Sequence, residues 1–265
     1  MKKPIKIIVM ALLGISLGLN AATEKREIKT FTAIENNCSI DIILSQGDEY
    51  KLTVIAPDKY IGKVETKVIS NTLIVDIKGN VYSTETFEIH ITAKSISELV
   101  LNGSGDLEIE GILNTESLNV ELHGSGDFEG ALNVKDLDIS LYGSGDAEIS
   151  GVNGSLIVEQ HGSGDFEGNN LHLGTAYFTI NGSGDAEASG TSAMMELRQS
   201  GSGDFDGRSF KVKTAKIRKT SSGEADVYVI DNIDAKLSGS GDLNIKGQPE
   251  ITNFSASGSG DIRSL

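Results

Sequence analysis

Hydrophobic and polar residues alternate with a period of two along most of the chain. In residues 118–129, every second residue is apolar or glycine and the residues between them are polar or charged. The first set is Leu118, Val120, Leu122, Gly124, Gly126 and Phe128. This period is typical of strands with one buried face, and helical periodicity is almost absent. The pattern therefore predicts an all-β protein.

The tetrapeptide Gly-Ser-Gly-Asp occurs eight times, and a degenerate copy, Ser221-Ser222-Gly223-Glu224, fills the one gap in the series. The acidic residues that close the nine copies are Asp106, Asp127, Asp146, Asp165, Asp185, Asp204, Glu224, Asp242 and Asp261. Successive acids are 18 to 21 residues apart. This period suits one coil of a solenoid and is too short for a propeller blade of about 40 residues.

Nineteen extended residues span about 63 Å, enough for a closed coil of about three short sides. Nine coils stacked about 4.8 Å apart make a prism about 43 Å long. We therefore predict a parallel β-helix, right-handed because that hand dominates parallel crossovers, over residues 98–265. Residues 23–97 would form a β-rich N-terminal region before it. Antiparallel hairpins with two strands per repeat are the competing geometry.

The repeat itself has a structural interpretation. Both glycines of each motif fall at inward positions, where they would let the chain bend sharply at a corner, and Ser and Asp would bond local backbone groups. The residue after each motif acid alternates between large and small, which predicts dense packing from coil to coil. These residues are Leu107, Phe128, Ala147, Phe166, Ala186, Phe205, Ala225, Leu243 and Ile262.

The first residues predict export. Lys2, Lys3 and Lys6 precede an uncharged apolar run at 7–19, and small residues follow at 21–22. This is the pattern of a secretory signal peptide, assigned to residues 1–22, and the run is too short for a membrane span. No Cys follows the cleavage region, which argues against a lipid anchor. We expect the protein in the periplasm, on the outer-membrane surface or secreted.

The mature chain is strongly acidic. Its net charge falls from −15 to −18 without residues 1–22, which hold three Lys and no Asp or Glu. Nucleic-acid binding needs an excess of Lys and Arg, so it is excluded as a function. The lone Cys38 cannot form an intramolecular disulfide, and its place in an alternating run predicts a small buried apolar residue.

Several segments resemble a known family. They are residues 31–34 (Phe-Thr-Ala-Ile), residues 39–48 ending in Ser-Gln-Gly-Asp, residues 71–73 (Asn-Thr-Leu) and the Gly-Ser-Gly-Asp series. Over roughly residues 28–265 the chain resembles the autotransporter-adhesin "head GIN domain" proteins, exported bacterial β-helix proteins found widely in Bacteroidetes. The resemblance implies an envelope or secreted location and an adhesin-like role, and it brings no catalytic residues.

Motifs for catalysis or cofactor binding do not emerge from the mature sequence. The only Gly-x-Ser-x-Gly segment, residues 14–18, lies in the signal peptide, and the repeat lacks the Lys of a P-loop and the spacing of a dinucleotide fingerprint. His123 and His161 are two coils, or about 10 Å, apart, too far to share one metal ion. We predict no catalytic and no cofactor-binding residues.

One basic run stands out where the motif degenerates, and it consists of Arg208, Lys211, Lys213, Lys216, Arg218 and Lys219. Alternation places Lys211 and Lys213 on a solvated strand face. We predict that Lys211, Lys213 and Arg218 dock a glycan or protein partner that is acidic. The chain would thus be a non-enzymatic, adhesin-like binding scaffold. The alternatives are a lyase-like or glycosidase-like enzyme on a β-helix and a purely structural envelope protein.

Acidic residues also lie two positions after most motif acids, which predicts two parallel rows of carboxylates. Local backbone and Ser groups would relieve their repulsion, or Ca²⁺ would bind between coils. The candidate cation ladder is Asp127, Glu129, Asp146, Glu148, Asp165 and Glu167.

The last motif ends at Asp261, close to the C-terminus. An open β edge there is a template for association, so we expect a homo-oligomer or a partner at that end.

Overall fold

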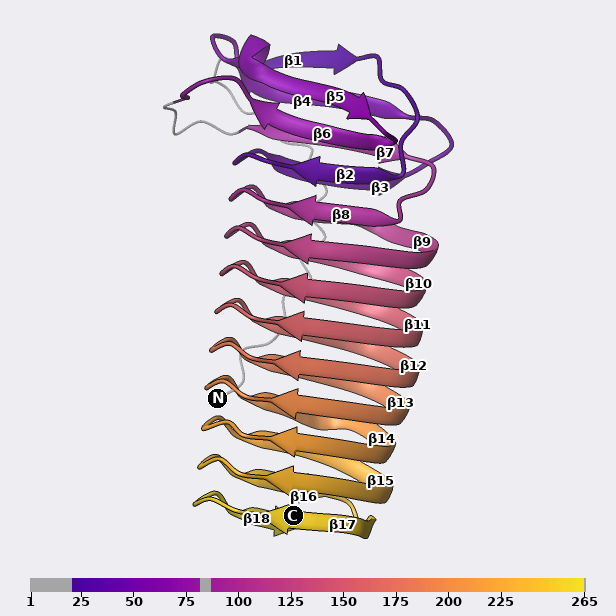
Figure 1. Ribbon diagram of the computed structural model, residues 1–265. Coiled ribbons are helices and arrows are strands. Elements are labelled where there is room, and N and C mark those ends of the chain that lie inside the picture. Colours follow the sequence, from indigo (N-terminus) through magenta and orange to yellow (C-terminus); the bar gives the residue numbers. More distant parts are fainter. Residues whose placement is uncertain (1–20, 82–86, 265) are drawn as a thin grey trace.

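The structure is a computed structural model that describes residues 21–81 and 87–264. Strands account for nearly all of its regular structure, with one short 3-10 helix, η1 (Ile61–Lys63). The long axis runs from a cap of short strands to a regular stack of coils (Figure 1). The predicted signal peptide lies almost entirely outside the described residues.

The strands fall into two groups. Those of the N-terminal part are β1 (Ala21–Arg26), β2 (Ala33–Asn36), β3 (Asp41–Gln46), β4 (Lys51–Pro57), β5 (Val64–Ile69), β6 (Thr72–Ile77) and β7 (Glu88–Ala93). Those of the repeats are β8 (Glu98–Leu101), β9 (Leu107–Leu122), β10 (Phe128–Leu141), β11 (Ala147–Gln160), β12 (Phe166–Ile180), β13 (Ala186–Gln199), β14 (Phe205–Lys219), β15 (Ala225–Leu237), β16 (Leu243–Lys246), β17 (Glu250–Ala256) and β18 (Ile262–Ser264).

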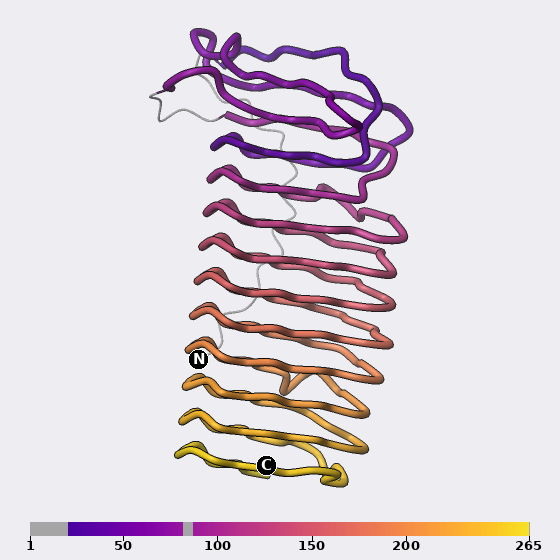
Figure 2. The backbone as a smooth tube through the Cα atoms, in the orientation of Figure 1, coloured from indigo at the N-terminus to yellow at the C-terminus, as the bar shows by residue number. Residues whose placement is uncertain are grey.

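The repeats form a parallel β-solenoid of about nine turns, as the sequence predicts (Figure 2). Each strand from β9 to β15 runs around a coil and pairs in parallel with the strands before and after it. Phe128, for example, pairs with Leu107 in one neighbour and with Ala147 in the other. The alternative of antiparallel hairpins within the repeats is therefore wrong.

Each long strand bends twice. In β9 the alternation of buried and exposed residues is interrupted at residues 110–112 and again at 116–117, where consecutive side chains are exposed. These interruptions divide the strand into three straight runs, which agrees with the predicted coil of about three short sides. The Gly-Ser-Gly-Asp corner then closes the coil.

The N-terminal strands do not follow the chain order in space. β2 pairs in parallel with both β6 and β8, and β3 does the same with β7 and β9, so the β2–β3 coil lies between segments that follow it in sequence. β4 pairs antiparallel with β1 and β7, and β5 pairs antiparallel with β6. These antiparallel strands cap the solenoid.

The interior is largely apolar along the stack, and large side chains in one layer are offset by small ones nearby. The large rings of Phe128, Phe166 and Phe205 are buried, and a glycine follows each of them two residues later. A Cβ at Gly168 would lie 3.0 Å from the ring of Phe166, so the ring occupies the space that a side chain would fill. Where alanine replaces the ring, as at Ala147, a larger residue such as Ile149 follows.

The motif glycines serve the stacking of coils. A Cβ on Gly143 would lie 1.8 Å from the carbonyl oxygen of Gly124, and one on Gly145 would lie 2.0 Å from that of Gly126. Neither glycine has a positive φ. The chain bends at each motif, as expected, but these glycines are needed for the close approach of consecutive backbones and not for a left-handed conformation.

Candidate binding surface

The motif aspartates hold the coils to one another. Asp127 Oδ1 accepts the backbone N–H of Asp146 at 2.8 Å, and Asp146 Oδ1 accepts that of Asp165 at 2.8 Å. The same bond begins at Asp41, which accepts from Asp106 at 3.1 Å, recurs from coil to coil as far as Glu224, and occurs again where Asp242 accepts from Asp261. The sequence predicted bonds within one turn, but the donor belongs to the next coil.

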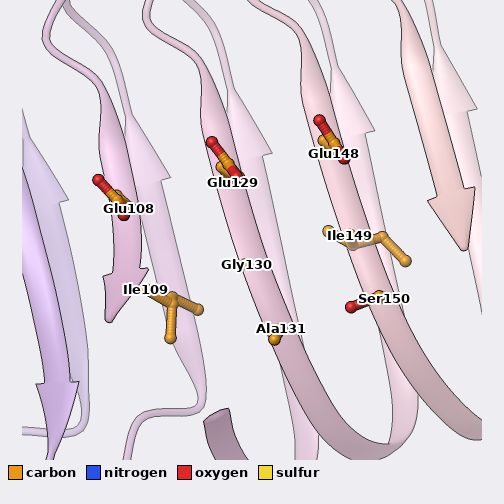
Figure 3. Close-up of a pocket in the computed structure, with 8 residues that line it drawn as sticks. All are labelled: Glu108, Ile109, Glu129, Gly130, Ala131, Glu148, Ile149 and Ser150. Carbon is orange, nitrogen blue, oxygen red and sulfur yellow. The ribbon is translucent and has the colours of Figure 1, made fainter. Parts of the chain in front are cut away.

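The outer carboxylates form a separate row beside a shallow pocket of about 190 Å³ (Figure 3). Glu108, Glu129 and Glu148 come from three consecutive coils and line it together with Gly130 and its neighbours. Partial burial and the negative charges of Glu167 and Glu129 raise the pKa of Glu148. The pocket is smaller than the 300–1,000 Å³ or so that is usual for small-molecule sites.

The structure does not assemble the six residues of the predicted cation ladder into a single metal site. Within residues 21–81 and 87–264, no three His, Cys, Asp or Glu side chains converge closely enough to hold an ion. The carboxylates instead lie in rows, one per coil, with Glu129 paired in register with Glu148. Cation binding by Asp127, Glu129, Asp146, Glu148, Asp165 and Glu167 stays a prediction.

The basic run does not form one patch. Arg208 contacts Asp206 and Asp226, and Lys216 Nζ lies 3.1 Å from Glu196 Oε1. Arg218 forms a two-pronged ion pair with Asp234, with the closest N–O distance 2.7 Å. Lys211 and Lys213 are exposed, as alternation predicts, but on a different run of β14 from Arg218.

Lys219 is buried, although it belongs to the basic run. Its side chain is 1% exposed, and Nζ donates to the Ser221 hydroxyl at 2.8 Å and to the Gly223 carbonyl. Burial lowers the pKa of Lys219. A Lys this close to a Ser hydroxyl can act as the base of a catalytic Ser–Lys pair. Ser221 and Lys219 are both buried, however, so a substrate cannot reach them in this structure.

A basic-aromatic patch, which we define as Lys211, Lys213, Tyr228 and Lys246, lies on the exposed side of β14, β15 and β16. Lys211 pairs in register with Tyr228, and Tyr228 with Lys246. The Lys246 ammonium lies 4.8 Å from the centre of the Tyr228 ring, and that of Lys211 lies 5.8 Å away. The sequence alone did not point to Tyr228 or Lys246, although Tyr228 lies one repeat after Lys211 and Lys246 one repeat after Tyr228.

Charge is segregated along the solenoid axis. Residues 98–200 contain 18 Asp and Glu but only two basic residues, Lys135 and Arg198, whereas residues 201–265 contain nine of each sign. The basic-aromatic patch therefore lies on the neutral part of the stack. An anionic ligand meets less repulsion there than on the acidic coils.

Three aromatic rings stack beside the corners of β9 to β11. Tyr142 lies between His123 and His161, with ring centres 4.9 and 5.3 Å apart and planes within 4° of parallel. The two imidazoles are thus separated by a phenol ring. Because the rings cover one another's faces, they are poor platforms for stacking a sugar.

Cys38 lies at the first corner and is half-buried. Its thiol contacts Asn36 Oδ1 at 3.3 Å, and burial raises its pKa to about 11. It occupies a position that glycine takes in the later corners, since the Cβ of Gly103 would lie 1.9 Å from the Cys38 carbonyl oxygen.

The sequence of most of this solenoid matches a family model described as "Putative auto-transporter adhesin, head GIN domain", over residues 30–189 and again over 175–249. The chain belongs to this family. The family assignment agrees with the resemblance seen in the sequence and supports an exported, adhesin-like role at the cell surface. No curated protein matches the chain.

Solved structures share the fold of this head GIN domain protein. One, titled a putative adhesin from Parabacteroides distasonis, has a TM-score of 0.70 and 19% identity, covering 92% of this chain and 97% of its own. Another, titled a putative lipid binding protein from the same species, has a TM-score of 0.66 and 24% identity, covering 93% and 97%. A putative adhesin from Parabacteroides merdae has a TM-score of 0.63 and 19% identity, covering 93% and 96%.

A search of the described residues for membrane-spanning helices finds none that is long and apolar enough.

Proposed function

We propose that the protein is an exported, non-enzymatic adhesin-like scaffold that binds an acidic glycan through the basic-aromatic patch. The observation that carries the proposal is the Tyr228 ring, which lies between two ammonium groups on the neutral part of the solenoid. An aromatic ring offers an apolar contact to a sugar, and Lys groups pair with carboxylate or sulfate substituents. Family membership supports the surface role.

The geometry gives less support to an enzyme. A glycosidase needs two carboxyl groups about 5 to 9.5 Å apart that flank a substrate in a cleft. The carboxylates described here lie in regular rows, and the pocket beside them is small. A purely structural role is the remaining alternative, and it predicts no ligand for the patch.

A glycan array tests the proposal. The purified mature chain is applied to neutral, carboxylated and sulfated glycans, and the array is read for both bound protein and released product. We expect retention on acidic glycans, no product, and weakening by salt because the contacts are ionic. The Lys211→Ala/Lys213→Ala/Lys246→Ala variant should lose at least about tenfold in affinity, since two or three charge contacts vanish.

Two matched variants show whether the patch is the site. Lys135→Ala removes an exposed Lys from the acidic coils and should leave binding unchanged. Arg218→Ala, which the sequence placed in the site, should also bind, because Arg218 lies on another run and is paired with Asp234. Equal binding by the triple variant and the wild type would contradict the proposal, as would retention of acidic proteins but of no glycan.

A further inference from the structure

One exposed sheet face of the solenoid lies just before the Gly-Ser-Gly-Asp corners. Two columns of outward side chains run along it, and each coil contributes one residue to each column. It is made by the last run of each strand from β9 to β15, whose arrowheads align along one side in Figure 1. The first column is Asn119, Asp138, Ile157, Tyr177, Glu196, Lys216 and Asp234. The second column is Glu121, Ser140, Glu159, Thr179, Arg198, Arg218 and Lys236. We call this the two-column face.

The two-column face is apolar at its centre and carries opposite charges on its two halves. Tyr177 on β12 is 37% exposed and lies next to Ile157 in the first column. The coils before β12 contribute acidic residues to this face. The coils after it contribute four basic residues, three of which also form ion pairs within the chain: Arg198 and Lys216 with Glu196, and Arg218 with Asp234.

The acidic half is crowded. Asp138 lies one coil from both Glu121 and Glu159, and partial burial together with their negative charges raises the pKa of Asp138. Cationic groups placed opposite would relieve this repulsion. The face therefore fits a partner surface that is apolar in the middle and basic on one side.

The face is complementary to itself. A twofold axis that runs along β12, parallel to the strand, places each coil before β12 opposite the coil equally far after it in a second copy. Three pairs of oppositely charged residues then form in each half of the interface. Glu159 faces Arg198, Asp138 faces Lys216, and Glu121 faces Lys236 of the second copy. The other charged residues face uncharged ones: Glu196 meets Ile157, Arg218 meets Ser140, and Asp234 meets Asn119.

From this symmetry of charge we propose that the protein forms an antiparallel dimer in which the two-column faces of two copies pack together across β12. Tyr177 and Thr179 lie on the axis and meet their own counterparts. Such an interface is isologous, the commonest kind in soluble homodimers. A parallel arrangement of the same faces would instead lay the acidic half of each copy over the acidic half of the other.

The area is sufficient for a weak to moderate dimer. Seven coils about 4.8 Å apart and a width of about 20 Å give roughly 600 Å² per copy. The total of about 1,200 Å² is at the lower end of specific interfaces. Because much of the complementarity is electrostatic and solvent-accessible, the dimer should weaken as salt rises.

Charge-reversal variants test the axis and the pairing together. In sedimentation velocity of the mature chain at low salt, we expect a concentration-dependent dimer for the wild type. Asp138→Lys alone and Lys216→Glu alone should each raise the dimer dissociation constant at least about tenfold, because each homodimer then opposes like charges twice. An equimolar mixture of the two variants should regain the dimer, because every pair in the heterodimer is again attractive.

Lys213→Glu serves as the control, since Lys213 is exposed on another run of β14 and should not alter the dimer. Circular dichroism verifies that each variant is folded. A wild type that stays monomeric at high micromolar concentration would overturn the proposal. So would single variants that still dimerise, which points instead to the open end of the stack at β17 and β18, or a mixture that stays monomeric.

Discussion

At Gly145 an added methyl group would lie 2.0 Å from the carbonyl oxygen of Gly126 in the preceding coil. The same close approach recurs from corner to corner, because coils about 4.8 Å apart superpose their motif backbones. The motif thus repeats because each copy must fit against the one before it. The motif Asp also joins neighbouring coils, because its carboxylate accepts the backbone N–H of the motif Asp in the next coil.

The glycine contact gives a prediction at this scale. Gly145→Ala should destabilise the protein by at least about 3 kcal/mol, because backbone must move to admit the methyl group. Gly174→Ala is the matched control within the solenoid, since its Cβ would meet one atom at 3.6 Å and its φ is not positive. It should change the free energy of unfolding by less than about 1 kcal/mol. Urea denaturation measures both, and equal effects would refute the role assigned to Gly145.

At the scale of the strand, alternation predicts the buried and exposed residues of the straight runs of β9 to β15, because successive side chains of a strand point to opposite faces. It does not predict the two bends at which consecutive side chains are exposed. It also contains the signal for Lys219, which has the parity of the buried Ile217 and pairs in register with Gln199. The basic residues around Lys219 obscure this signal. At this position the periodicity, and not the local composition, indicates that the side chain is buried.

Other features could not be predicted from one repeat. The aspartate bonds join residues about 20 positions apart, and their geometry depends on how the coils stack. The insertion of the β2–β3 coil between later strands also has no local signal. The partners of Arg218 and Lys216 became visible only when strand register was known.

The buried Lys219 gives a pH-dependent prediction. Its folded-state pKa lies below the unfolded value, so its charged form costs stability at neutral pH, and this cost disappears as pH rises toward about 10.4. Lys219→Gln keeps a donor for the Gly223 carbonyl, as Gln199 does for Gly203. We expect the variant to gain about 1–2 kcal/mol near pH 7.

Thermal and urea unfolding across this pH range provide the check. The advantage of Lys219→Gln over the wild type should shrink steadily with rising pH, because the wild-type Lys becomes neutral in the folded state first. Lys213→Gln, at an exposed position of the same strand, should show no such trend. An advantage that stays constant with pH would mean that packing, not charge, limits stability at this site.

For the whole molecule, the net charge of −15 conceals a division into acidic coils and neutral ones. For the proposed functions, this division makes the neutral coils the less repulsive site for an anionic ligand and sets the acidic half of one copy against the basic half of the other in the antiparallel dimer. It also concentrates repulsion in the middle of the stack. Carboxylates on neighbouring coils, such as Glu129 and Glu148, cost about 0.9 kcal/mol per pair at about 4.8 Å even in water.

That repulsion makes the acidic coils sensitive to cations, which gives a final prediction. In the motif row, one oxygen of each Asp is already engaged by the next coil, whereas the outer row of Glu108, Glu129 and Glu148 borders the pocket. If Ca²⁺ bridges outer carboxylates, millimolar CaCl₂ should raise the melting temperature by several degrees more than NaCl of equal ionic strength. Glu129→Gln/Glu148→Gln should lose that difference, while Asp231→Asn, outside the rows, should keep it. Equal effects of the two salts on the wild type would show that the rows are a solvated acidic face that any cation screens.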